Sequence, residues 1–195
     1  ERISDIVVGW KKDGKTPVTA REIKGIGSIM ALLRDAIKPN LVQTVEGVPT
    51  IVHMGPFGNI AHGCSSILAD KLAVNCGEYV VTEAGFGADL GFEKFMDIKV
   101  RQGGPKPSAA VVVATIRGLK WHGGVAIKDM DEPDSDAVRR GAENLKNAMR
   151  IVAMYGLPVV VAINRFPGDS PEEIGVVREV AMAAGASGVE EAKGF

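Results

Sequence analysis

The residues of this sequence that can do chemistry gather in four glycine-bearing stretches. Each stretch follows a short apolar, often β-branched run, which is typical of a strand buried in a parallel sheet. The carboxyl ends of parallel strands meet at one edge of a sheet, where α/β proteins bind ligands. We therefore expect one ligand site built from Gly55–Gly63, Glu83–Gly91, Arg117–Gly124 and Asn164–Asp169.

The second stretch carries two carboxylates. Glu83 directly follows the apolar run Tyr79–Thr82, and Asp89 comes later on the same glycine-rich loop. A carboxylate at the carboxyl end of a strand is well placed for a ligand, and neighbouring glycines allow a ligand to approach the backbone closely. The alternative is a tight turn whose aspartate caps a short helix.

The other stretches offer a proton carrier, positive charges and an aromatic ring. His62 could shuttle a proton, although a histidine just before a helix is also typical of a hydrogen-bonded structural residue. Arg117 and Lys120 suit a phosphate or carboxylate, and would otherwise form a solvated helix face or a salt bridge. Asn164 could read a polar ring edge and Phe166 could stack on that ring, whereas the alternative is a turn with a packed phenylalanine.

Two elements are expected before residue 40. The run Ile3–Trp10 indicates a short strand or the tail of a helix, and a turn follows it. Thr19 and Glu22 have the spacing of a capping box, and apolar residues then recur at helical spacing until Pro39. This pattern predicts an amphipathic helix of about five turns.

Strands and helices alternate through the rest of the chain, which predicts an α/β fold with a mostly parallel sheet flanked by helices. The predicted strands are Val48–Met54, Tyr79–Thr82, Ala109–Ile116 and Val159–Ile163. The predicted helices are Ser65–Asn75 with Ile67, Leu68, Leu72 and Ala73 inward, Phe92–Phe95, a long one from the acidic turn Asp131–Asp136 through Met154, and Ser170–Ala184.

The overall composition is that of an ordinary globular protein, with 46% apolar and 24% charged residues. A net charge of -1 gives no electrostatic footprint for nucleic acid or an anionic membrane. Cys64 and Cys76 lack the spacing of a zinc site, and we expect free thiols. No apolar run approaches the roughly 20 residues of a membrane span and no signal-peptide pattern is present, so a cytoplasmic protein is expected.

Several catalytic motifs are missing from the sequence. There is no G-x-x-x-x-G-K-[ST] phosphate loop, no G-x-S-x-G elbow and no H-E-x-x-H motif. The chain begins at Glu1 without an initiator methionine, and no closing element is predicted at Lys193–Phe195. These ends raise the expectation of a piece of a longer protein.

Long strings of the sequence resemble formate–tetrahydrofolate ligase, also called formyltetrahydrofolate synthetase. The resemblance covers nearly the whole chain. It lies in Lys38–Thr44, Gly55–Gly63, Tyr79–Gly91, Val113–Gly124 and Pro158–Pro167, in the same order as in that family.

That resemblance implies an α/β enzyme with a P-loop-type nucleotide-binding core that uses ATP, Mg²⁺ and a stimulatory monovalent cation, K⁺ or NH₄⁺, as a homotetramer. It implies that formate is activated by ATP to formyl phosphate, which N10 of tetrahydrofolate then attacks. Such a mixed anhydride must be shielded from water, and positive groups and Mg²⁺ would neutralise the phosphoryl group.

The resemblance also implies roles for single residues. Glu83 is expected to bind Mg²⁺ or its water, and Phe166 with Pro167 to form a stacking wall for the pterin. The expected catalytic residues are Asn59, His62 and Arg117, and the expected cofactor-binding residues are Phe57, Lys120, Asn164, Phe166 and Pro167. Residues 1–155 would belong to the nucleotide-binding domain and residues 156–195 would continue into the folate-binding region.

The sequence departs from the family pattern in two places. The phosphate-loop lysine and threonine and the first glycine-rich signature are absent, and the second aromatic wall, usually a tryptophan, is not recognisable; Phe195 lies near its position. We therefore expect a central fragment of the ligase that is inactive alone. The alternative is a non-catalytic scaffold or a module that binds folate without ATP.

Overall fold

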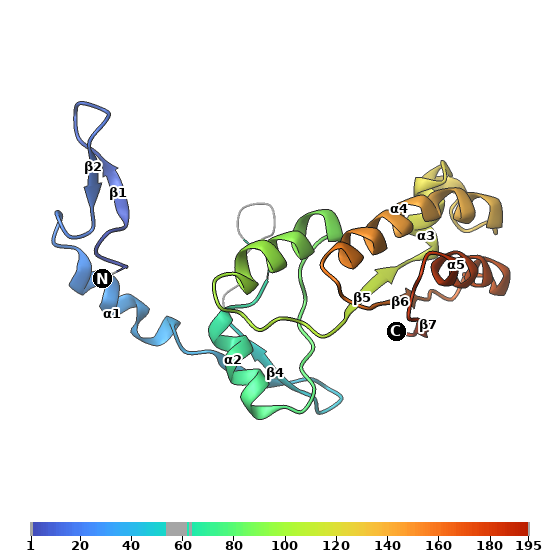
Figure 1. Ribbon diagram of the computed structural model, residues 1–195, viewed down its shortest axis with the longest axis horizontal. Helices are drawn as coiled ribbons and strands as arrows, with labels where there is room; N and C mark the ends of the chain where they lie inside the picture. The colour runs from blue at the N-terminus through green and yellow to red at the C-terminus, as the bar shows by residue number, and fades with distance from the viewer. Residues whose placement is uncertain (1, 54–61, 63, 195) are drawn as a thin grey trace. The chain divides into compact units, whose positions relative to one another are not determined.

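The chain folds into two units. A computed structural model describes residues 2–53, 62 and 64–194 (Figure 1). The first unit is Glu1–Met54 and the second is Gly55–Phe195. The second unit contains a parallel sheet with helices against it, which confirms the predicted α/β class.

A tight hairpin opens the first unit. β1 (Val7–Trp10) pairs antiparallel with β2 (Pro17–Thr19). In the turn between them, the Asp13 carboxylate accepts hydrogen bonds from the Thr16 hydroxyl and from the Lys15 and Thr16 N–H groups. These bonds, led by that of the Thr16 hydroxyl, lower the pKa of Asp13 to about 2.

The helix predicted to start at Thr19 starts later. The capping-box bonds do form, from the Thr19 N–H to Glu22 Oε2 at 2.9 Å and from the Glu22 N–H to Thr19 Oγ1 at 3.4 Å. They close only a turn, because Lys24 adopts a left-handed φ of 55° that stops helix propagation. α1 (Ile26–Ala36) begins after it, so the prediction of five turns was wrong.

A second hairpin follows α1. β3 (Asn40–Gln43) and β4 (Pro49–Val52) pair antiparallel around a turn that Gly47 permits with its φ of 84°. The strand predicted at 48–54 therefore exists, but its placement in a parallel sheet was wrong, because strands joined by a short turn pair antiparallel. The buried His53 is bonded through Nε2 to the Ala36 carbonyl at 2.9 Å.

The second unit begins with α2 (Ile67–Cys76), capped by Ser66 as predicted to within a residue or two. Its buried residues are Ala69 and Asp70, and Ile67 and Ala73 are partly buried. Leu68 and Leu72 are about half exposed, so the predicted inward face was wrong for these two residues. The apolar run Tyr79–Thr82 is not a strand either. A strand needs a neighbour to pair its backbone, and within the described residues none pairs with it.

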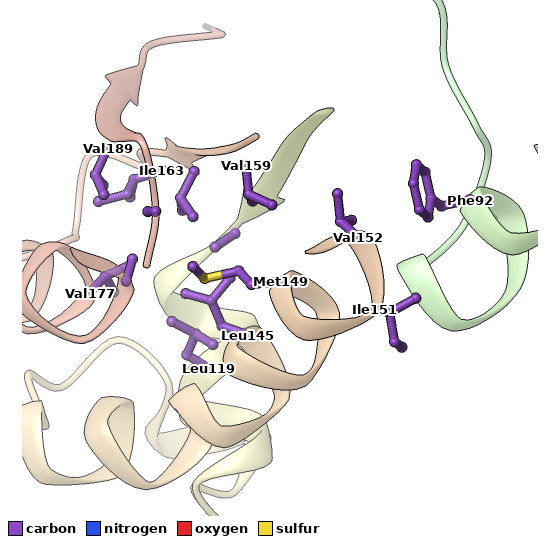
Figure 2. Close-up of a cluster of buried hydrophobic side chains, with 14 of the residues drawn as sticks. Phe92, Leu119, Leu145, Met149, Ile151, Val152, Val159, Ile163, Val177 and Val189 are labelled. Carbon is purple, nitrogen blue, oxygen red and sulfur yellow. The ribbon is translucent and has the colours of Figure 1, made fainter. Parts of the chain in front are cut away.

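Two π-helical segments, η1 (Ala88–Phe92) and η2 (Phe95–Val100), extend the short helix predicted at 92–95. The Phe92 ring meets the Tyr155 ring edge-to-face at 5.4 Å. Phe92 belongs to the same buried cluster as Ile151 and Val152 in the C-terminal part of α4 (Figure 2).

The sheet of the second unit consists of β5 (Ala110–Ala114), β6 (Val159–Asn164) and β7 (Gly188–Ala192), parallel and in that order. β5 and β6 were predicted, and β7 was missed. Between β5 and β6 come α3 (Ile116–His122), η3 (Ile127–Asp129) and α4 (Ser135–Met154), and α5 (Pro171–Ala183) leads to β7. The sheet thus continues across the boundary predicted after residue 155; the functional division there stays a prediction.

One face of the sheet carries the core. Val159, Val161 and Ile163 are at most 5% exposed. They pack with side chains of α3, α4, α5 and β7, as Figure 2 shows for Leu119, Leu145, Met149, Val177 and Val189. Val111 and Val113 alternate with the buried positions of β5, and they are 60% and 65% exposed. The opposite face of β5 is therefore uncovered by the described residues.

Two other sequence predictions concern thiols and membranes. Cys64 is buried and Cys76 is exposed, and both are free thiols, as predicted. In the part of the chain that the structure describes, no helix combines the length and apolar character needed to span a bilayer.

Candidate functional site

Polar groups follow all three strands at the carboxyl edge of the sheet. Thr115, directly after β5, caps α3 by accepting a hydrogen bond from the Gly118 N–H at 3.0 Å. Asn164 ends β6 and is half-buried. The Arg165 N–H bonds to the Ala192 carbonyl at the end of β7, at 3.0 Å. This edge is where an α/β sheet is expected to bind a ligand.

The turn after β6 is closed by a pair of reciprocal hydrogen bonds. The Phe166 N–H donates to Asp169 Oδ2 at 2.8 Å, and the Asp169 N–H donates to the Phe166 carbonyl at 3.0 Å. Phe166 is half-buried, Pro167 is exposed and Asp169 is 8% exposed. The turn therefore places Phe166 and Pro167 at the carboxyl edge of the sheet, and their role as a stacking wall stays a prediction.

Arg165 lies beside this turn in an ion pair. Its Nη1 is 2.9 Å from Glu191 Oε2 on β7, and both side chains are about one-third exposed. The pair bridges the ends of neighbouring strands. The guanidinium thus partly neutralises a carboxylate next to Asn164 and Phe166.

Lys120 is buried inside the helical layer. Its Nζ lies 2.5 Å from Glu173 Oε1, 2.9 Å from the Glu132 carbonyl and 3.2 Å from the Met130 carbonyl. An ammonium has three N–H donors, and three acceptors surround this one. The predicted cofactor contact of Lys120 stays a prediction, and it requires one of these partners to give way.

Glu173 joins the starts of two helices. Its Oε1 accepts from the Asp134 N–H at 2.9 Å, at the N-cap of α4, and its Oε2 accepts from the Ser170 N–H at 3.0 Å, at the N-cap of α5. Burial alone would raise the pKa of the Glu173 carboxyl. The bonds from Lys120, Asp134 and Ser170 outweigh burial, so this pKa lies below its usual range.

Arg117, predicted to be catalytic, is exposed on α3. Its Nη1 is 3.2 Å from Asp131 Oδ1, and both side chains are at least half exposed. An exposed pair of this kind is weak, so the guanidinium can leave Asp131 for a ligand at little cost. The structure thus shows a surface salt bridge, and the catalytic role stays a prediction.

A second group of charges lies between α2 and η2. Lys99 Nζ is 2.5 Å from Asp70 Oδ2, with both side chains at most 5% exposed, and it lies 4.7 Å from the centre of the Phe95 ring. By distance the two groups form an ion pair, and neither atom has a further hydrogen-bond partner among the described residues. Burial raises the pKa of the neighbouring Cys64 thiol.

Glu83, predicted to bind metal, is exposed in the extended segment before η1. The next turn has left-handed φ values at Gly85 (64°) and Phe86 (57°). A Cβ on Gly91 would lie 1.3 Å from the Gly85 carbonyl oxygen, so only glycine allows this close packing. Within the described residues no cluster of three or more His, Cys, Asp or Glu side chains forms a metal site.

The remaining predicted residues belong to the stretch of sequence before α2. His62 is exposed. Phe57 and Asn59 lie outside the described residues. The structure therefore brings Asn164, Phe166 and Pro167 together at one edge of the sheet.

Glu83 lies close enough to Cys64 for its charge to help raise the pKa of that thiol, after the larger effect of burial. The segment that follows Glu83, η1, packs through Phe92 against Tyr155, which ends α4. The turn of Phe166 is linked instead to the opposite, N-terminal end of α4, through α5 and Glu173. The convergence of the four stretches on one site stays a prediction, because most of Gly55–Gly63 lies outside the described residues.

Four buried charged residues were not proposed as site residues from the sequence: Asp70, Lys99, Asp169 and Glu173. The helix start at Ser170 was predicted, and Ser170 and Glu173 form a capping box there. No local pattern indicated that Glu173 would also bind Lys120. For Asp70 and Lys99 we find no sequence signal beyond a charged residue on an amphipathic segment.

A shallow depression lies elsewhere on the unit, around the end of α3. Its lining is Trp121, Gly124, Val125, Ala126, Ile127 and Lys128. Trp121 and Ile127 are 54% and 70% exposed. None of the predicted catalytic or binding residues lines it.

Comparison with known proteins gives one consistent family. The family model for formate–tetrahydrofolate ligase matches residues 1–195. A formate–tetrahydrofolate ligase from a Nocardioides species is 56% identical over 184 residues, 94% of this chain and 32% of that protein. The Roseiflexus ligase is 54% identical over 98% of this chain and 35% of its own length, and the Sphingobium ligase 53% identical over 96% and 34%. The chain spans about a third of the length of these relatives.

Proposed function

Because this chain belongs to the formate–tetrahydrofolate ligase family, we propose that it forms the central part of a ligase that joins formate to tetrahydrofolate. The observation that carries the proposal is the family match over residues 1–195, with more than half of the residues identical to those of curated ligases. The reaction would consume ATP and formate, pass through formyl phosphate and yield 10-formyltetrahydrofolate, ADP and phosphate.

In this proposal the carboxyl edge of the sheet holds the folate. Phe166 and Pro167 form a flat apolar wall for the pterin, and the Asn164 amide hydrogen-bonds a polar edge of that ring. The location of Asn164 at the end of β6, with Phe166 and Pro167 in the turn that follows, supports the assignment. Phe57, Asn59 and His62 would complete the pocket for the pterin and formyl phosphate.

We further propose that Glu83 holds Mg²⁺. Mg²⁺ is usually bound by one or two carboxylates together with water and substrate phosphates, so a single exposed carboxylate fits its needs. The metal would neutralise phosphate charge. Arg117 is the proposed positive partner of the formyl phosphate or the folate carboxylate, because its weak surface pair with Asp131 leaves it available.

No phosphate loop occurs in the sequence, and we derive no step of ATP cleavage from the residues of this chain. The chain alone is therefore proposed to be inactive, and the intact enzyme to act as a cytoplasmic homo-oligomer, a homotetramer in the family. A monovalent cation, K⁺ or NH₄⁺, is part of the same proposal.

Calorimetry separates this function from a non-catalytic one. The full-length ligase that carries this chain is titrated with tetrahydrofolate and with ATP·Mg²⁺, each alone and each in the presence of the other. A ligase binds both ligands and forms 10-formyltetrahydrofolate when formate is added. Folate binding that is unaffected by ATP, with no product, would instead identify a folate-binding module and contradict the proposal.

A further inference from the structure

A buried carboxylate holds the backbone of the proposed stacking residue. Asp169 Oδ2 accepts from the Phe166 N–H at 2.8 Å, while the Asp169 N–H donates to the Phe166 carbonyl at 3.0 Å. Both polar groups of the Phe166 backbone are thus bonded to one residue. Because the side chain leaves the backbone at a fixed angle, these two bonds restrict the direction in which the Phe166 ring points.

The turn itself is anchored at both ends. On one side it continues β6, whose Ile163 is fully buried in the core. On the other side it enters α5 at Ser170, whose N–H binds the buried Glu173. Pro167 adds a fixed φ inside the turn. Asp169 therefore helps to hold the turn between two rigid elements.

From this geometry we propose that Asp169 is a positioning residue for folate: it fixes the backbone of Phe166, and so the direction of the Cα–Cβ bond from which the ring reaches the pterin, without touching the ligand. The inference rests on the proposed function, in which Phe166 and Pro167 form one wall of the folate site. Stacking depends on the offset and tilt of the two rings. Loss of the Asp169 acceptor weakens folate binding in the ground state and in the transition state equally.

Such uniform weakening has a defined kinetic result. KM for tetrahydrofolate rises while kcat and KM for ATP stay unchanged. A purely structural role would instead lower the melting temperature or affect all kinetic constants together. The two roles can therefore be distinguished by steady-state kinetics.

The test uses the full-length ligase that carries this chain, with four substitutions and kinetics for both substrates. Asp169→Ala removes the acceptor and should raise KM for tetrahydrofolate about tenfold. Asp169→Asn keeps an acceptor oxygen and should stay within about twofold of the parent enzyme. Glu172→Ala removes an exposed carboxylate from the same helix start and should change neither constant. Phe166→Ala removes the ring itself and should raise the same KM by at least as much as Asp169→Ala.

Asp169→Glu keeps the test decisive if Asp169→Ala does not fold. It retains the charge but moves the acceptor by one methylene, so it should raise KM for tetrahydrofolate at an unchanged melting temperature. An unchanged KM for tetrahydrofolate in Asp169→Glu, or equal losses in kcat and both KM values in Asp169→Ala, would overturn the positioning role. If Phe166→Ala leaves KM for tetrahydrofolate unchanged, the proposed folate wall itself is wrong.

Discussion

Lys120 and Glu173 form a buried ion pair that ties α3 to the starts of α4 and α5, with 2.5 Å between Nζ and Oε1. Their side chains are 2% and 0% exposed. Removing one partner of such a pair leaves an unpaired charge in the protein interior, which is strongly destabilising. Replacing both partners by apolar side chains would cost much less. The pair therefore specifies how the helices around the sheet edge meet.

We expect Lys120→Met to lower the free energy of unfolding of this chain by about 3–5 kcal/mol. The measurement is urea unfolding followed by circular dichroism. Lys146→Met is the matched control, because Lys146 pairs with Glu143 on the surface and its loss should cost less than about 1 kcal/mol. Similar losses of unfolding free energy in both variants would show that the buried pair is no more important for stability than the surface pair.

Glu173 also predicts a specific pH dependence. Its pKa is lowered below the ordinary 4.5, so its carboxylate stabilises the fold above that pH, and the contribution is lost as the pH falls through the lowered value. Glu173→Gln should therefore be less stable at neutral pH and lose less stability on acidification than the parent chain. Unfolding free energies measured from neutral to acid pH test this.

The control for the acid titration is Glu179→Gln. The pKa of Glu179 is also lowered, by its hydrogen bond and charge interaction with Arg139, but the pair is exposed and screened by solvent. Its substitution should leave the loss of unfolding free energy at acid pH nearly unchanged. If the free energy of unfolding falls with decreasing pH equally in Glu173→Gln and in the parent chain, the role given to Glu173 is contradicted.

A glycine packed between two helices and a glycine with free space around it should respond in opposite ways to substitution by alanine. A Cβ on Gly141 would lie 1.8 Å from the Leu119 carbonyl oxygen, so Gly141→Ala should cost about 1–3 kcal/mol of stability or more. Gly175 in α5 has nothing within 4 Å of a Cβ, and Gly175→Ala should add about 0.5–1 kcal/mol. Melting temperatures of the two variants should shift in opposite directions, and a shift of the same sign would contradict the packing described.

The uncovered face of β5 predicts the behaviour of the chain on its own. Val111 and Val113 expose 60% and 65% of their surface in a parallel strand, a type of strand that is normally covered on both faces. Replacing both by threonine, which keeps β-branching, should reduce self-association and binding of an apolar dye. Sedimentation measures the self-association and dye fluorescence measures the exposed apolar surface. Unchanged values would mean that this face of β5 does not cause the self-association.

Local sequence patterns predicted those elements that a short run of residues is enough to indicate. The apolar run of β6 and the start of α5 at Ser170 were both found from the sequence. Tyr79–Thr82 has the same type of run but is not a strand, because a strand also requires a neighbour that accepts its hydrogen bonds. β7 was missed since it contains Glu190 and Glu191, and only one of its residues is buried.

The site residues show the same division between local and distant causes. The sequence placed Asn164 and Phe166 after a strand, and the structure confirms their position at the sheet edge. A local pattern could not show that Lys120 would find Glu173, because the two meet only when α3 and α5 pack together.

A chimeric ligase tests most directly whether this chain is the central part of a formate–tetrahydrofolate ligase. This chain replaces the matching third of the Nocardioides relative, with which it shares 56% identity. The chimera is assayed for 10-formyltetrahydrofolate with formate, ATP, Mg²⁺ and tetrahydrofolate. We expect product that depends on formate and ATP, and none from this chain alone. A folded chimera that binds ATP but forms no product, or full activity of the isolated chain, would contradict the proposal.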